Sequence, residues 1–390
     1  MPAARHAVIL VAGASTRTRP LTEHRPKPLI PLLGQPLLAH ILDELVGLID
    51  RVTLVVGYRA DQIIAQFGAE YRGMALRYVH QTVINGTAGA LLAAAPIDEP
   101  FLLLYGDNLI DRADVIGVCQ HRYAVAGLRV ADPRSFGVLD VRDGLVYRII
   151  EKPAHPPADA LANPGIYHFD EEVFPLARQI IPSPRGELEL TDLIALLSAL
   201  HPIACHICAG HWIPVGTPWE ALLAARFLLA RMAQSQIAST ARIDDQVELE
   251  GTVVIGEGAQ IGAQARIVGP TVIGPRAIVG PGALVVASVL EAGATIGPGA
   301  MVGGSVIGAE AMVGADAMVS HSWIDDEAQI GHHAALNAAE LPDAQPVAVV
   351  NGVLSLAEMR TRGAVIAARS FVAPQSVVAP GSVVTYGASA

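Results

Sequence analysis

The C-terminal part of the chain carries a repeat that few folds can accommodate. A branched apolar residue recurs at every sixth position, shifts frame by one residue at three places, and resumes after a break. These residues stand at positions 237, 243, 249, 255, 261, 267, 273, 279, 285, 290, 296, 302, 307, 313, 319, 324, 330, 366, 372, 378 and 384. A helix needs a period of 3.6 and a strand a period of two, whereas six residues fit one side of a triangular coil. A low-complexity Gly/Ala tract would not keep such a phase, so we predict a left-handed parallel β-helix over residues 236–390.

The front of the chain follows a different pattern. Residues 1–218 alternate short apolar runs with helix-like segments, as in a doubly wound, Rossmann-like α/β domain. We expect strands at His6–Ala12, Val52–Gly57 and Phe101–Tyr105, and helices at Leu37–Leu48 and Ala88–Ala95. A further helix, Trp219–Met232, would form a linker over residues 219–235.

Composition limits where the protein works and what it binds. The chain is 52% hydrophobic and 16% charged, with a net charge of −11, which argues against nucleic acid or an anionic membrane as a partner. No apolar run approaches the roughly 18 residues needed to span a bilayer, and the run Val8–Ala14 is too short and too close to Arg17 for a secretory signal. Three cysteines make no disulfide framework, so we expect a cytoplasmic protein.

A phosphate-binding loop is predicted directly after the first strand. Its small residues would let backbone N–H groups surround phosphate oxygens; they are Ala12, Gly13, Ala14 and Ser15. Arg17 and Lys27 follow and add positive charge. Together these features predict a site for a nucleoside triphosphate.

The same stretch resembles the sugar-1-phosphate nucleotidylyltransferases. The resemblance rests on the segments Val11–Arg17, Pro20–Thr22 and Pro26–Leu29, and the sequence departs from the family pattern at Ser15 and Thr18. It implies transfer of a nucleotidyl group from a nucleoside triphosphate to a sugar 1-phosphate, with release of pyrophosphate. Gln81, Gly86 and Thr87 match the family's base-recognition segment and favour UTP or dTTP, although Gln81 alone could be an ordinary exposed polar residue.

Further motifs appear in the family's order. Asp107 ends an apolar strand and, by resemblance, is a magnesium ligand; with Arg17, Lys27 and Lys152 it completes the implied catalytic set. The resemblance also implies that Gly137, Glu151 and Asn163 hold the sugar phosphate. Which sugar is used does not follow from these motifs.

One departure from the family pattern bears on activity. Pro214 stands where many relatives have a second metal-binding aspartate, and a proline side chain cannot bind a cation. Either Asp107, the phosphates and water hold the metal, or the domain is weak, or it is a catalytically silent regulatory subunit that binds sugar nucleotides. A zinc site made of nearby residues is disfavoured, because two of its cysteines would face opposite sides of a strand; these residues are His201, Cys205, Cys208 and His211.

The predicted coil allows two roles. It resembles that of the bifunctional N-acetylglucosamine-1-phosphate uridylyltransferase/glucosamine-1-phosphate acetyltransferases, in which the coil transfers an acetyl group from acetyl-CoA, and His321 stands where that family has its general base. The chain also resembles glucose-1-phosphate thymidylyltransferases. Two features depart from the acetyltransferase pattern: His332–Ala339 replaces the pocket turns, and Ile324 replaces a tyrosine. The alternative role is assembly of a homo-oligomer, either a trimer or a dimer or tetramer.

Overall fold

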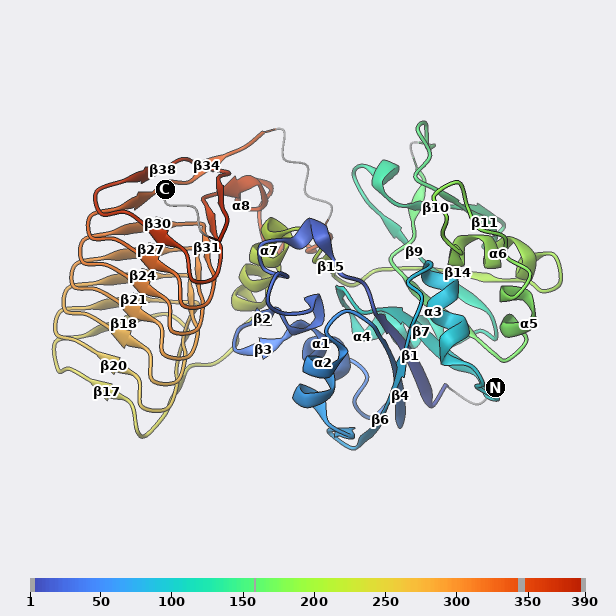
Figure 1. The fold of residues 1–390 in the computed structure, drawn as a ribbon, viewed down its shortest axis with the longest axis horizontal. Helices are drawn as coiled ribbons and strands as arrows, with labels where there is room; N and C mark the ends of the chain where they lie inside the picture. The colour runs from blue at the N-terminus through green and yellow to red at the C-terminus, as the bar shows by residue number, and fades with distance from the viewer. Residues whose placement is uncertain (1–3, 158, 343–347, 387–390) are drawn as a thin grey trace.

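The computed structural model describes residues 4–157, 159–342 and 348–386. It consists of an α/β domain and a long coil of stacked strands, with helix α7 (Pro218–Ala230) lying between them (Figure 1). Within the described residues, no helix has both the length and the apolar character needed to cross a bilayer.

The front domain is built on a mixed sheet that contains a block of four neighbouring parallel strands. Its strands run in the order β12-β10-β11-β14-β9-β13-β7-β1-β4-β6-β5. Their bounds are β1 (His6–Val11), β4 (Arg51–Val56), β5 (Glu70–Tyr71), β6 (Met74–His80), β7 (Phe101–Tyr105), β9 (Ala124–Arg129), β10 (Gly137–Arg142), β11 (Leu145–Glu151), β12 (Leu161–Ala162), β13 (Ile166–Phe169) and β14 (Ala204–Ile207). The three predicted strands are confirmed as β1, β4 and β7, which pair in parallel and are apolar on both faces because both faces are buried.

Helices and small sheets surround this main sheet. The helices are α1 (Leu37–Asp43), α2 (Ala60–Phe67), α3 (Thr87–Ala94), α4 (Arg112–Val118), α5 (Val173–Ala177) and α6 (Leu190–Ser198). Two small sheets pair β2 (Pro31–Leu32) with β3 (Gln35–Pro36), and β8 (Asn108–Ile110) with β15 (Trp212–Pro214). The helix expected to reach Leu48 ends at Asp43; beyond it the chain forms tight turns, in which the Leu45 N–H donates to the Leu42 carbonyl at 2.9 Å and the Leu48 N–H donates to the Leu45 carbonyl at 2.9 Å.

The predicted β-helix is confirmed as three parallel sheets, each forming one side of the coil (Figure 1). The first contains β16 (Gln236–Ile237), β19 (Val253–Ile255), β22 (Thr271–Ile273), β25 (Val289–Leu290), β28 (Val306–Ile307), β31 (Trp323–Ile324), β36 (Val365–Ile366) and β39 (Val383–Val384). The second contains β17 (Arg242–Ile243), β20 (Gln260–Ile261), β23 (Ile278–Val279), β26 (Thr295–Ile296), β29 (Met312–Val313), β32 (Gln329–Ile330) and β37 (Phe371–Val372). The third contains β18 (Glu248–Glu250), β21 (Arg266–Val268), β24 (Leu284–Val286), β27 (Met301–Gly303), β30 (Met318–Ser320), β33 (Ala335–Leu336) and β38 (Val377–Val378).

The frame shifts of the repeat have a structural cause. Each shift falls at the corner that leads from the third sheet to the first, and a buried serine lies at each of these corners: Ser288, Ser305 and Ser322. The Ser305 N–H donates to Ser288 Oγ at 3.1 Å, and the Ser322 N–H donates to Ser305 Oγ at 3.0 Å. Each serine hydroxyl therefore accepts the hydrogen bond of a backbone N–H in the next rung, at a corner that is one residue shorter than the others.

The break in the repeat is an insertion that returns to the front domain. After β33 the chain leaves the coil, forms β34 (Ala339–Glu340), α8 (Leu356–Arg360) and β35 (Thr361–Arg362), and re-enters at β36. On the way, Val349 exchanges two backbone hydrogen bonds with Trp212 of β15. Val350 and Leu354 are buried in the same core cluster as α7 and the front sheet, so the insertion joins the coil to the front domain.

Candidate active site

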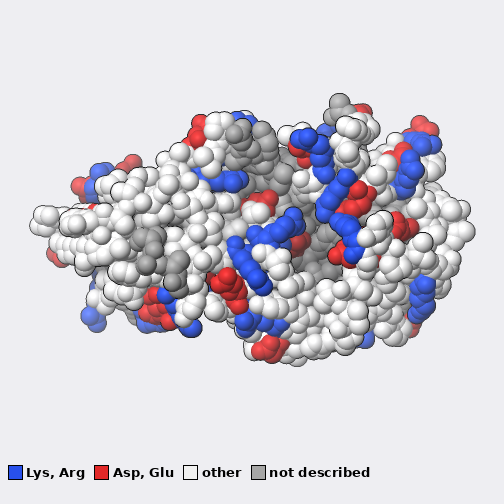
Figure 2. All heavy atoms as spheres, turned by 45° about the horizontal axis from the view of Figure 1, so that its top comes forward, with Lys and Arg blue, Asp and Glu red and all other residues white. Residues whose placement is uncertain are grey.

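A cavity of about 560 Å³ opens where β1 and β7 end. This volume lies within the range of small-molecule sites, and the carboxyl ends of parallel strands are where α/β folds place their ligands. Figure 2 shows a hollow in the front domain with Lys and Arg side chains gathered along its rim. The basic residues that line the cavity are Arg17, Lys27, Lys152 and Arg185.

The loop after β1 forms one wall of the cavity. Ala12, Gly13 and Ser15 line it, whereas Ala14 does not. Ser15 adopts left-handed backbone angles, φ 50° and ψ 51°, which turn the chain sharply at the strand end. A Cβ atom at Gly13 would meet nothing within 4 Å, so the backbone there faces open space into which phosphate oxygens fit.

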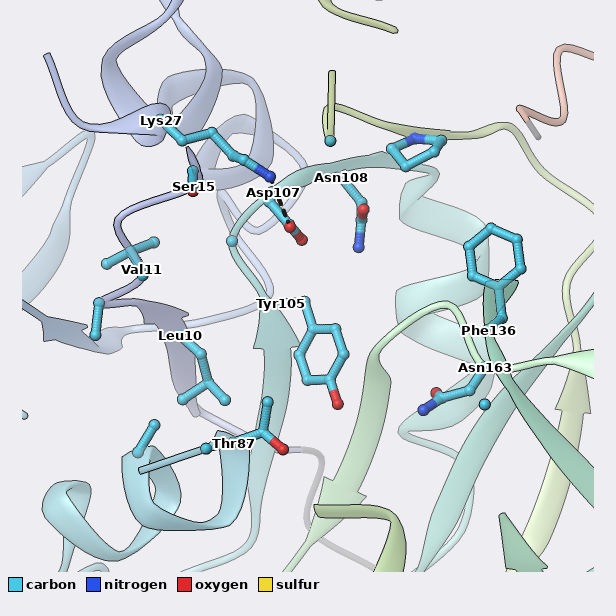
Figure 3. A pocket seen from close by; sticks show the side chains of 18 of the residues that line it. Leu10, Val11, Ser15, Lys27, Thr87, Tyr105, Asp107, Asn108, Phe136 and Asn163 are labelled. Atoms are coloured by element: carbon cyan, nitrogen blue, oxygen red, sulfur yellow. Dashed lines mark hydrogen bonds and ion pairs between the residues drawn. The ribbon is translucent and has the colours of Figure 1, made fainter. Parts of the chain in front are cut away.

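Lys27 and Asp107 meet inside this cavity. Lys27 begins a 3₁₀ turn, Lys27–Leu29, and its Nζ lies 3.0 Å from Asp107 Oδ2 (Figure 3). The Lys27 side chain is only 8% exposed while that of Asp107 is 43% exposed, so the carboxylate is accessible to a ligand. Gly106 lets β7 approach β1 closely, since a Cβ there would lie 2.3 Å from Val11 Cγ1.

The segment predicted to recognise the base lies on the α3 side of the cavity. Gln81 is buried and its Nε2 donates to Asn85 Oδ1 at 3.2 Å and to the Gly86 carbonyl at 3.1 Å. Gly86 has a φ of 105°, and a Cβ there would lie 2.5 Å from the Leu188 carbonyl oxygen. Thr87 Oγ1 accepts the Leu190 N–H at 2.9 Å. These contacts hold the segment rigidly against the cavity.

The residues predicted to hold the sugar phosphate line the opposite wall; they are Gly137, Glu151, Lys152 and Asn163. Asn163 Nδ2 donates to the Tyr167 hydroxyl at 2.6 Å, and that hydroxyl lies 3.2 Å from the hydroxyl of Tyr105. Burial raises the pKa of Tyr105 to about 12, so this phenol stays neutral near pH 7. Lys152 Nζ lies 3.5 Å from Glu151 Oε1.

Several lining residues were not singled out from the sequence, among them the charged residues Arg185, Glu189 and Glu220. Arg185 pairs with Glu189 at 2.8 Å and with Glu151 at 3.4 Å. Glu220, in the first turn of α7, accepts the Gly216 N–H at 2.8 Å, and burial raises its pKa. Their position in the chain next to family motifs was the available signal.

The residues expected to hold magnesium fit it in part. Asp107 offers one accessible carboxylate, and Pro214 lines the same cavity without a ligand atom in its side chain. Within the described parts of the chain, no three or more His, Cys, Asp or Glu side chains are grouped to hold a metal ion. Mg²⁺ is commonly bound through one or two carboxylates together with substrate phosphates, so a cation at Asp107 would need the phosphates as ligands.

Two other predicted residue sets lie outside the cavity. His321 sits at a corner of the coil with a φ of 46°, and its Nδ1 lies 3.0 Å from Ser320 Oγ. Burial lowers the pKa of His321 to about 4, so the ring is neutral near pH 7. Of the residues weighed for zinc, the two histidines each pair with a carboxylate: His201 Nε2 lies 2.8 Å from Glu172 Oε2, and His211 Nδ1 lies 3.0 Å from Asp111 Oδ2.

Family models match both parts of the chain. The model described as "Nucleotidyl transferase" matches residues 6–231, and the model of the GMPPB C-terminal domain matches residues 249–343. A solved UDP-glucose pyrophosphorylase in complex with UDP-glucose superposes with a TM-score of 0.53, covering 59% of this chain and 100% of that one. At 20% identity, that likeness concerns the fold alone.

Curated relatives from archaea share higher identity. The bifunctional protein GlmU of Methanocaldococcus jannaschii is 37% identical over 255 residues, 65% of this chain and 60% of its own length. A bifunctional sugar-1-phosphate nucleotidylyltransferase/acetyltransferase of Sulfurisphaera tokodaii is 33% identical over 263 residues, 65% of this chain and 63% of that protein. The matches thus span about 60% of the length of these two relatives.

A shorter relative is matched over most of its length. The UTP–glucose-1-phosphate uridylyltransferase AglF of Haloferax volcanii is 38% identical over 201 residues, which cover 49% of this chain and 82% of that protein. The family model covers more than half of the chain and contains the residues that line the cavity. With the fold of the front domain and the arrangement of its cavity, these matches establish that the chain belongs to the nucleotidyl transferase family.

Proposed function

We propose that the chain transfers a nucleotidyl group from a nucleoside triphosphate, with UTP or dTTP favoured, to a sugar 1-phosphate. The products are an NDP-sugar and pyrophosphate. The observation that carries the proposal is that Arg17, Lys27 and Asp107 line the same cavity as Glu151 and Lys152. One cavity thus offers positive charge for two phosphorylated substrates and an acidic group for sugar hydroxyls. The names of the relatives support this reaction.

The proposed reaction needs alignment and charge stabilisation and no covalent intermediate. An oxygen of the sugar phosphate bonds to the α-phosphorus while the bond from that phosphorus to the bridging oxygen breaks, and pyrophosphate leaves with the electron pair. Lys152 would orient the attacking phosphate, and Arg17 and Lys27 would neutralise charge on the leaving pyrophosphate. The Gln81 amide would bind the base, and the Glu151 carboxylate and Asn163 amide would bind sugar hydroxyls.

We further propose Mg²⁺ as the cofactor. Asp107 would hold it, and the cation would supply additional neutralisation of phosphate charge. The ion pair from Lys27 keeps the Asp107 carboxylate directed into the cavity. Because Pro214 supplies no side-chain ligand, the affinity for the metal in the absence of nucleotide should be low.

The test is an assay of pyrophosphate release with a panel of nucleoside triphosphates and sugar 1-phosphates in the presence of Mg²⁺. Release that requires both substrates and is fastest with a pyrimidine nucleotide supports the proposal. If the protein binds a sugar nucleotide but releases no pyrophosphate with any pair, it is the silent regulatory subunit and the proposed reaction is wrong.

For the coil we propose assembly of a homo-oligomer. The register aligns the outward-facing side chains of successive rungs on the third sheet into an apolar column: Leu284, Met301, Met318, Ala335 and Val377. Met301 is 41% exposed and Met318 46% exposed, which is unusual for large apolar side chains and typical of a contact face. Light scattering should give a mass above that of one chain, and Met301→Glu with Met318→Glu should reduce it.

Acetyl transfer is a second candidate for the coil, because one relative is named as an acetyltransferase as well as a nucleotidylyltransferase. His321 would be its base and acetyl-CoA its co-substrate. A histidine whose pKa is about 4 is a weak proton acceptor, which counts against this role. Release of free thiol from acetyl-CoA in the presence of amino-sugar phosphates would support it.

The three free cysteines fit a reducing compartment such as the cytoplasm.

A further inference from the structure

The loop between Ser15 and Lys27 is held together by a chain of short contacts. The Thr22 hydroxyl donates to the Ser15 carbonyl at 3.0 Å, and the Thr18 hydroxyl donates to the Gly216 carbonyl at 3.1 Å. The Thr18 N–H in turn donates to the Ser15 carbonyl at 3.0 Å. A displacement at the far end of this loop would therefore reach both Ser15 and Lys27, which line the cavity.

Side chains from the front domain hold the first half of the far end. The Tyr58 hydroxyl donates to the Thr22 carbonyl at 3.2 Å, and Arg59 donates to the Glu23 carbonyl at 2.8 Å. Gln62 Nε2 donates to the His24 carbonyl at 3.3 Å. These bonds reach backbone atoms of residues 22–24. None of these bonds involves the residue that directly precedes Pro26.

That residue, Arg25, is held by the coil. Its Nη2 donates to Asp325 Oδ1 at 2.8 Å and to Asp326 Oδ2 at 2.7 Å. The side chains of Arg25 and Asp325 are 15% and 3% exposed, so the pair is shielded from water and from salt. Charge-assisted bonds of this kind are strong and directional. A buried carboxylate left without its partner carries a large cost, so the coil keeps Arg25 in this position.

A second contact of the loop with the coil lies beside the first. The ring of His24 meets that of Tyr386 edge to face, with 6.2 Å between ring centroids. Tyr386 follows the last coil strand, β39. The tip of the loop therefore rests on the final rungs of the coil through two neighbouring side chains.

We propose that Arg25 is a positioning residue for nucleotidyl transfer, through which the coil fixes the loop that carries Arg17 and Lys27. This inference rests on the proposed function and adds to it: the coil becomes part of the machinery of the front domain. The competing explanation is that Arg25 only fastens the two domains together. The two explanations differ, because a mere fastening affects stability without affecting how the triphosphate is bound.

The test compares full-length variants by steady-state kinetics. Arg25→Ala should lower kcat/KM by about tenfold or more, since a displacement of about 1 Å can cost on the order of 10²-fold. KM for the triphosphate should rise more than KM for the sugar 1-phosphate, because the displaced residues face the triphosphate. Arg25→Lys should restore part of the loss. Asp326→Asn changes the partner of Arg25 on the coil. Because Asp326 is only partly buried, this variant should show the same pattern more weakly.

Hydrogen exchange gives a readout that needs no activity. The amides of Thr18, Leu21 and Glu23 donate to carbonyls inside the loop and should exchange faster in Arg25→Ala. The control is Arg369→Ala: Arg369 pairs with Glu327 at 2.8 Å on the same part of the coil, and its kinetics and loop exchange should match wild type.

The outcomes separate the possibilities. Wild-type kinetics and wild-type loop exchange in Arg25→Ala, with only a lower unfolding temperature, would overturn the inference and leave a fastening role. If the wild-type chain released no pyrophosphate, the proposed function would be wrong. The exchange measurement would then still decide whether Arg25 fixes the loop.

Discussion

Replacing Glu291 by glutamine tests how the coil meets the front domain. Glu291 is 7% exposed, and its Oε1 accepts the Gly34 N–H at 3.1 Å. Burial raises its pKa from 4.5 to about 7, with Asp326 adding to the rise and Arg25 opposing it. Glutamine keeps an oxygen that can accept the Gly34 N–H and removes the charge.

The sign and size of the effect follow from proton linkage. The folded state keeps the Glu291 proton between pH 4.5 and about 7, while the unfolded state loses it. The wild-type free energy of unfolding therefore falls as pH rises through this window. A rise from 4.5 to about 7 corresponds to about 3 kcal/mol at pH 8, where the carboxylate is ionised in both states. Glu291→Gln has no carboxyl group to ionise at this position, so its free energy of unfolding does not fall in this way.

The assay is urea unfolding of both proteins at pH 5 and at pH 8. Glu291→Gln should be more stable than wild type at pH 8, by up to about 3 kcal/mol, and the difference should fall below about 1 kcal/mol at pH 5. Glu310→Gln changes an exposed carboxylate on the same coil and serves as the control. An equal difference at both pH values, or a less stable variant at pH 8, would refute the reasoning.

Three further predictions concern the cavity and the coil. Lys27→Ala should lower kcat by about 10²–10³-fold in the pyrophosphate assay, and a near wild-type rate would contradict its assignment. Gln81→Ala should reduce the ratio of kcat/KM for UTP over GTP, and an unchanged ratio would remove Gln81 from base recognition. Gly363→Ala should lower the free energy of unfolding by about 1–3 kcal/mol, because its Cβ would lie 1.9 Å from the Ser320 carbonyl oxygen. The matched control is Gly303→Ala, whose Cβ meets nothing within 4 Å; equal stability losses would refute the packing argument.

The coil could be predicted because its six-residue repeat corresponds to one side of the triangular coil. The repeat positions from Ile255 onward, such as Ile261, Ile296 and Ile330, are buried in one continuous core that runs along the coil, whereas Ile237 and Leu249 in its first turn are 50% and 39% exposed. Local patterns also located β1 and β7, since strands buried on both faces are apolar without alternation. Many of the cavity-lining residues, such as Lys27, Asp107 and Glu151, belong to short motifs that could be recognised in the sequence.

Features that depend on distant contacts could not be read from the sequence. The three frame shifts were visible, but their cause became clear only when Ser288 and its counterparts were seen stacked at one corner. The bond between Arg25 and Asp325 joins residues 300 positions apart. No local pattern marks Val349 as a partner of Trp212. The end of α1 was misjudged because the apolar pattern continues past Asp43, where the chain turns tightly and leaves the helix.

The central claim is that the loop after β1, Lys27 and a cation at Asp107 converge on one triphosphate. The most direct measurement is a crystal structure of the protein with a non-hydrolysable UTP analogue and Mg²⁺. We predict phosphate density beside the backbone of Gly13 and Ser15, with Lys27 Nζ in contact with a phosphate oxygen and the cation bound to Asp107. A triphosphate bound elsewhere, or bound here without contact to Lys27 and Asp107, would contradict the account.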